Sequence, residues 1–122
     1  MGEPLNLDPE ALQRLQRLGG DVFVCKMIDL FLDYAGKRIA EARAAQVAGN
    51  FAAVEMAVHP LKSSAGNVGA DRVQALAARS EALAETGPSE ALTAALGELE
   101  QAFADIKPEL EEKRRGFVPP AK

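Results

Sequence analysis

The stretch His59-Pro60-Leu61-Lys62-Ser63-Ser64-Ala65-Gly66-Asn67-Val68-Gly69-Ala70 decides the fold. We expect it to form most of a helix over Phe51–Val68, because Asn50 can cap the start and Gly69 suits the end. Its apolar residues gather in one stripe on a helical wheel, which must face a core. They are Val54, Ala57, Leu61, Ala65 and Val68. His59 lies on the opposite side, at the centre of the exposed face.

Capping residues, prolines and glycines on both sides of this stretch predict four more helices. A short helix begins at Asp8-Pro9-Glu10 and ends at Gly19-Gly20. A longer one follows from Asp21 to Gly49, and another begins with Asp71 as its cap. The last follows the turn at 86–89, and Pro108 should kink or end it. Inward positions of these helices include Leu12, Leu15, Leu18, Phe23, Ile28, Phe31, Ile39, Val73, Leu76, Ser80, Leu92, Leu96, Leu99 and Ile106.

This pattern of helices predicts an all-α fold. Four long amphipathic helices with short loops indicate an antiparallel four-helix bundle, with the additional short N-terminal helix as a lid. The 122 residues favour a single domain over 1–122, with a core at about 7–115 and a flexible tail at 116–122. We expect a monomer, because a bundle of this size needs no partner to bury its core.

Composition and charge exclude several classes of function. The formal net charge of −4 argues against nucleic-acid binding. Residues 1–8 do not resemble a signal peptide, and no apolar run reaches membrane-spanning length, so we expect a cytoplasmic protein. Cys25 lies in an apolar run and is expected to be a small buried residue. One histidine and one distant cysteine do not make a ligand set, so we expect no metal site.

The exposed face around His59 is unusual for a solvated helix. Half of its residues within two turns are small, namely Ala52, Ser63 and Gly66, and the others are Glu55, Met56 and Lys62. A glycine inside a helix costs about 1 kcal/mol relative to alanine. Gly66 therefore suggests that another molecule approaches closely, although fraying near the helix end would also tolerate it. On composition alone, His59 is equally an idle surface residue.

The chemistry of imidazole favours a functional interpretation of His59. An imidazole with a pKa near about 6.5 is substantially neutral at the pH of the cell, so one ring nitrogen keeps a lone pair. That nitrogen can attack a phosphoryl group without a separate base. Lys62, one turn on, can place positive charge near the phosphoryl oxygens, or can be a plain solvated lysine. Ser63 can hydrogen-bond the ring or a phosphoryl oxygen, and we assign Glu55 no role.

The stretch from His59 to Ala70 resembles the signature of histidine-containing phosphotransfer (HPt) domains. That signature has a histidine, a leucine two residues on, a lysine three on, small residues, and a closing Gly-Ala step. The segments Leu18-Gly19-Gly20 and Ile28–Leu32 are also similar to this family. The resemblance covers about 7–85. Many members have glycine in place of Ser63, and Pro60 is more unusual, either tilting the imidazole outward or causing a tolerated bend.

The resemblance implies a phosphorelay intermediate rather than a self-contained enzyme. His59 would carry the phosphoryl group, and Lys62 would stabilise it. Met56, Ser63, Gly66 and Phe23 would contact receiver domains of response regulators and of hybrid histidine kinases. The chain itself would need no cofactor, because Mg²⁺ belongs to the receiver. The sequence contains no Gly-rich phosphate-binding loop, so we expect no ATP site.

Two other functions fit the sequence. The chain can be a docking module that binds receiver domains without being phosphorylated, in which case a variant without His59 keeps its affinity. It can also be the phosphoacceptor hairpin of a sensor kinase. Such hairpins place proline further beyond the histidine and normally precede an ATP-binding domain, which makes this the weaker alternative.

Overall fold

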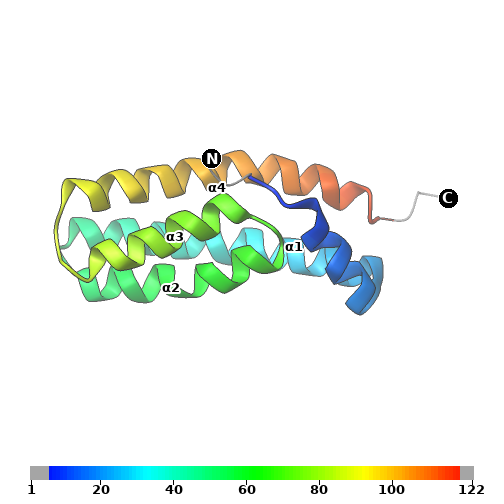
Figure 1. The fold of residues 1–122 in the computed structure, drawn as a ribbon, viewed down its shortest axis with the longest axis horizontal. Helices are drawn as coiled ribbons and strands as arrows, with labels where there is room; N and C mark the ends of the chain where they lie inside the picture. Colours follow the sequence, from blue (N-terminus) through cyan, green and yellow to red (C-terminus); the bar gives the residue numbers. More distant parts are fainter. Residues whose placement is uncertain (1–5, 119–122) are drawn as a thin grey trace.

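The computed structural model describes residues 6–118, and this part of the chain contains four helices. They are α1 (Pro9–Val47), α2 (Phe51–Asn67), α3 (Asp71–Ala84) and α4 (Glu90–Arg115). Short turns join them into an antiparallel bundle in which α1 and α3 each pack against both α2 and α4 (Figure 1). The predicted all-α fold of four long helices is confirmed.

The separate N-terminal helix is not confirmed, because α1 is one element of 39 residues. Gly20 inside it has non-helical dihedrals, φ 84° and ψ −178°, and the chain bends sharply there (Figure 1). We call residues 9–19 the N-terminal arm. The inward position predicted for Leu18 is wrong, since this side chain is 79% exposed. Leu18 lies two residues before the bend at Gly20 and outside the packed core.

The N-terminal arm lies against the turn between α2 and α3. Asp8 caps the arm, its carboxylate accepting from the Glu10 backbone N–H at 3.0 Å. The Asp8 backbone N–H donates to the Gly69 carbonyl at 2.8 Å. This bond fixes the start of α1 directly at the end of α2. Asp71 does not cap α3 as predicted; Ala70 occupies that position and makes no side-chain cap bond.

The core contains the stripe predicted from the wheel of α2, since Val54, Leu61, Ala65 and Val68 are fully buried and Ala57 nearly so. Cys25 is also buried, as expected. Of the two outcomes predicted for Pro108, a kink or the end of the helix, the second is wrong, because α4 continues to Arg115. The backbone bond that Pro108 removes would go to the carbonyl of exposed Ala104, which water can reach, while Ile106 and Leu110 on either side stay buried and hold the helix.

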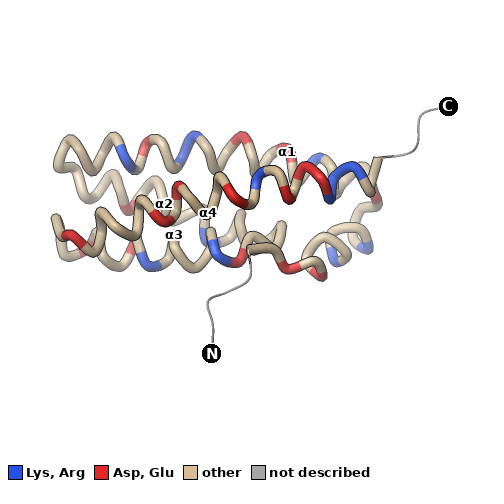
Figure 2. Tube along the Cα trace, turned by 90° about the horizontal axis from the view of Figure 1, so that it is seen from above, with Lys and Arg blue, Asp and Glu red and all other residues tan. Residues whose placement is uncertain are grey.

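The two ends of the chain lie partly outside the described residues. Residues 119–122 of the expected tail are not among them, whereas Phe117 is half-buried against the core. Acidic and basic residues are interspersed along the helices in the described part of the chain (Figure 2). Within 6–118, no helix combines the length and apolar character needed to cross a membrane.

Ser80 is the one buried polar residue of the described core, and its Oγ has no hydrogen-bond partner there. An unsatisfied buried hydroxyl costs free energy, and alanine is the better helix former. We expect Ser80→Ala to raise the free energy of unfolding by about 1 kcal/mol in urea denaturation. Ser64→Ala is the matched control, because the Ser64 hydroxyl donates to the Pro60 carbonyl at 3.1 Å. A less stable Ser80→Ala protein would contradict this prediction.

Candidate functional site

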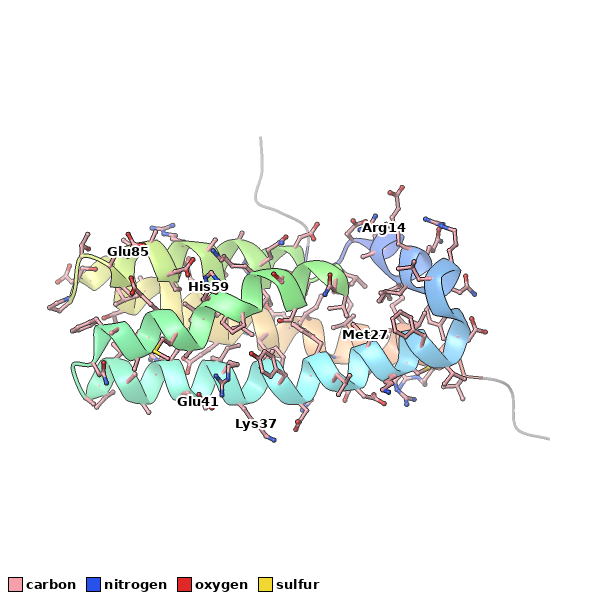
Figure 3. All side chains as sticks on the ribbon, turned by 90° about the horizontal axis from the view of Figure 1, so that it is seen from below. Arg14, Met27, Lys37, Glu41, His59 and Glu85 are labelled. Carbon is pink, nitrogen blue, oxygen red and sulfur yellow. The ribbon has the colours of Figure 1, made fainter. Side chains whose placement is uncertain are left out.

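His59 lies on the exposed side of α2, as predicted. The helix is fixed at its start by Asn50, whose side chain accepts from the Ala53 backbone N–H at 3.1 Å. It continues through Pro60 to Asn67. The His59 side chain is 65% exposed and lies where α2 passes α3 (Figure 3). The imidazole is therefore within reach of a molecule that binds from solution.

A residue that the sequence did not reveal, Glu81 on α3, meets His59. One oxygen of its carboxylate contacts Nδ1 of the imidazole, and the other lies 2.5 Å from Nζ of Lys62. The Glu81 side chain is only 20% exposed, against 34% for Lys62. One carboxylate thus holds together the histidine and the lysine that the sequence singled out.

The register of the α2–α3 hairpin explains this meeting. His59 and Glu81 are each eleven residues from Ala70, on either side of the turn. Gly66 and Gln74 are each four residues from it, and they also lie in contact: a Cβ at Gly66 would be 2.6 Å from Nε2 of Gln74. Antiparallel helices joined by a tight turn bring equidistant positions together, so the hairpin places Glu81 beside the imidazole.

The charge state of Glu81 determines which imidazole nitrogen is available. The hydrogen bond from Lys62 lowers the pKa of Glu81, and the contact with His59 acts in the same direction. Glu81 is therefore a carboxylate at neutral pH and can only accept a hydrogen bond. A neutral His59 must then carry its proton on Nδ1, which leaves the lone pair on Nε2.

The surface around the ring forms an open depression lined by Glu55, Met56, His59 and Glu81. Met56 is 75% exposed, so an apolar side chain lies beside the imidazole without a partner in the described chain. A second, smaller groove lies between α1 and α2, lined by Met27, Leu30, Phe31, Tyr34, Ser64, Asn67 and Val68. This groove borders the later part of α2, from Ser64 to Val68, on its α1 side.

The other residues predicted to contact a partner lie in different surroundings. Ser63 is exposed on the His59 face. Gly66 is half-buried, and the Gln74 side chain, which donates to the Lys62 carbonyl at 2.9 Å, takes the space a Cβ would need. A Cβ at Gly66 would displace the Gln74 amide from this carbonyl, so a contact within the chain also favours glycine at this position. Phe23 is half-buried against the core, near the bend in α1.

Comparison with known proteins places these features in a family. The model of the Hpt domain family matches residues 26–109. The fold is similar to that of histidine-containing phosphotransfer protein B from Pseudomonas aeruginosa, with a TM-score of 0.85 and 23% identity over 93% of this chain and 97% of that one. It is also similar to a rice protein described as a histidine-containing phosphotransfer protein, with a TM-score of 0.79 and 27% identity over 90% of this chain and 80% of that one. No curated protein matches the sequence.

Proposed function

Because this chain belongs to the Hpt domain family, whose role is phosphotransfer in two-component signalling, we propose that His59 is its phosphorylated residue. It accepts the phosphoryl group from the aspartate of one receiver domain and passes it to the aspartate of another. The contact of the Glu81 carboxylate with both His59 and Lys62 carries this proposal. An idle surface histidine needs no such contact, whereas a nucleophile needs a fixed tautomer.

The transfer step follows from the charges at the site. The Nε2 lone pair of His59 attacks phosphorus, the N–P bond forms, and the P–O bond to the aspartate breaks, which returns the receiver carboxylate. No proton moves at Nε2. Positive charge develops on the ring as the bond forms, and Glu81, accepting the hydrogen bond from Nδ1–H, stabilises that charge as a carboxylate does for the histidine of a catalytic triad.

Lys62 is the residue we assign to the phosphoryl group. Its ammonium lies on the same carboxylate as the imidazole, so it is already beside the ring. A flexible lysine can turn from Glu81 toward the phosphoryl oxygens when the group arrives. Mg²⁺ and the acidic residues that bind it are expected on the receiver domain, because phosphoryl transfer depends mainly on alignment and charge neutralisation.

The receiver is expected to dock over the His59 face of α2. Exposed Met56 and Ser63 adjoin the imidazole, and the apolar groove beside Tyr34 extends this surface toward α1. We include Gly66 and Phe23 in the docking residues on the family resemblance alone. Transient partners bury modest interfaces with an apolar centre, which suits a surface of this kind.

Labelling by a phosphorylated receiver tests the proposal. The purified protein is mixed with receiver domains phosphorylated by acetyl phosphate in the presence of Mg²⁺. We expect acid-labile, alkali-stable phosphate on the protein, located by tandem mass spectrometry in the peptide that contains His59. Binding to several receivers without label from any of them would make the chain a docking module and would refute the proposal.

The role of Glu81 gives a further prediction. Glu81→Ala removes the group that fixes the tautomer and stabilises the charged ring, and a charge-assisted hydrogen bond is worth about 1.5–3 kcal/mol. We expect the initial rate of phosphoryl transfer to His59 to fall about tenfold or more, with receiver affinity unchanged. The ring ¹⁵N chemical shifts of His59 should also lose the signature of a proton held on Nδ1.

Glu85→Ala is the control for this variant, since Glu85 is exposed at the end of α3 and does not line the depression. A Glu81→Ala protein with unchanged ring ¹⁵N shifts and an unchanged rate would show that the carboxylate does not position His59.

A further inference from the structure

A second carboxylate lies beside His59, and the proposed transfer step does not use it. Glu55 lines the same depression as His59 and Glu81 and is half-buried on α2. It lies one helical turn before the histidine, so the two Cβ atoms are about 6 Å apart. Any group attached to the ring enters the depression that Glu55 borders.

The charge of Glu55 is not compensated, in contrast to that of Glu81. Lys62 pairs with Glu81, and Glu81 also accepts the hydrogen bond from Nδ1–H of His59. Glu55 makes no ion pair or side-chain hydrogen bond within residues 6–118. The depression therefore carries an excess of negative charge at the place where a phosphate-binding site would carry positive charge.

From this arrangement we propose that Glu55 raises the free energy of phosphorylated His59 and thereby shifts the phosphoryl equilibrium from His59 toward the aspartate of a receiver domain. The inference rests on the proposed function, and it adds Glu55 as a residue that affects the equilibrium between the phosphorylated protein and the phosphorylated receiver. A phosphoryl group brings between one and two negative charges near neutral pH. Before phosphorylation the ring carries no negative charge, so the repulsion falls on the phosphorylated state alone.

The size of the effect follows from the separation. With the Cβ–Cβ spacing of about 6 Å as the scale of the separation, repulsion between a carboxylate and a group of nearly two negative charges, screened by water and salt, changes an equilibrium by about three- to tenfold. A docked receiver excludes water from the depression and strengthens the repulsion. The repulsion therefore also acts within the docked complex, and it lowers the fraction of the protein that carries the phosphoryl group at equilibrium.

The equilibrium between phosphorylated receiver and phosphorylated protein tests this inference. One receiver domain, labelled with ³²P-acetyl phosphate, is mixed with the wild-type protein, Glu55→Gln or Glu85→Gln at equal concentrations, with Mg²⁺. The ratio of histidine-bound to aspartate-bound label is read after equilibration. Glu85→Gln is the matched control, because it removes the same charge from α3 outside the depression.

We expect Glu55→Gln to raise this ratio about three- to tenfold, with a smaller gain at 0.5 M salt, and Glu85→Gln to leave it within about 1.5-fold. Glu55→Lys should raise it further. An unchanged or lower ratio in Glu55→Gln, with normal labelling of the wild type, would overturn the inference and leave the proposed function intact. A wild-type protein that takes no label would overturn both.

Discussion

His59→Ala is expected to remove all acid-labile phosphate from the protein while leaving its affinity for a receiver domain within about threefold of the wild type. The loss is complete because the variant has no imidazole, and the described chain offers no second histidine. Affinity is retained because docking depends on the surface around the ring, where Met56 and Ser63 are unchanged. Label is measured on gels run under alkaline conditions, and affinity by titration calorimetry.

A second variant separates the chemistry from the shape of the side chain. His59→Gln keeps a polar side chain of similar reach that can still meet Glu81, yet it has no nucleophilic nitrogen. We expect it to be unlabelled and as stable as the wild type. Acid-labile label on either variant would place the phosphoryl group on another residue, and a large loss of affinity in both would show that His59 serves mainly to bind.

Lys62 should behave differently from His59 in the same assay. Lys62 lies beside the nucleophile and forms no bond to phosphorus. Removing its ammonium group should therefore slow phosphoryl transfer to His59 without abolishing it. The contrast between a complete and a partial loss distinguishes the two assigned roles.

The sequence predicted the α2 face correctly because that prediction needed only local information. The apolar stripe from Val54 to Val68 fixes the inner side of the helix, and the outer side, with His59 at its centre, follows from helical geometry alone. Asn50 and Gly69 marked the two ends of α2 for the same reason, since capping is also local.

Glu81 was missed because its role depends on the pairing of two helices. Within α3 it lies next to buried Ser80 and looks like any half-exposed glutamate. The signal that would have found it is the turn at Gly69-Ala70. Counting equal distances from Ala70 along both helices pairs His59 with Glu81 and Gly66 with Gln74. The same count places the Gln74 amide in the space that a Cβ of Gly66 would need.

The errors at the two ends of the fold have one physical cause. Leu18 has the periodicity of a core residue, but the arm extends beyond the helices that would cover it. Pro108 has the properties of a helix breaker, but burial of Ile106 and Leu110 outweighs one lost backbone bond. Tertiary packing determines both the exposure of Leu18 and the continuation of α4 through Pro108, and a local sequence pattern contains no information on that packing.

Gly69 is the position where a single methyl group should cost the most stability. Its φ is +77°, and a Cβ there would lie 2.4 Å from the backbone oxygen of Asp8 and 2.9 Å from the Cβ of Ala11. Neither atom is the end of a flexible side chain, so the N-terminal arm itself must move. Its movement would break the 2.8 Å bond from the Asp8 N–H to the Gly69 carbonyl.

Gly49→Ala provides the matched control for Gly69→Ala. Gly49 has a φ of +76°, nearly the same as Gly69, but no atom lies within 4 Å of its Cβ position. The left-handed conformation alone costs about 1–2 kcal/mol in an L-residue. We expect Gly49→Ala to lower the free energy of unfolding by that amount. Gly69→Ala should lower it by about 3 kcal/mol or more, because displacing the arm also exposes buried apolar surface at Leu12 and Leu15.

Urea denaturation of both variants gives the difference in free energy directly. Hydrogen exchange then locates it: backbone amides in the N-terminal arm should lose protection in Gly69→Ala and keep it in Gly49→Ala. Equal losses of stability in the two variants would mean that the arm does not need the close approach of Gly69. A larger loss confined to Gly69→Ala, with unprotected arm amides, would show that the Gly-Ala step both closes α2 and holds the start of α1 against the bundle.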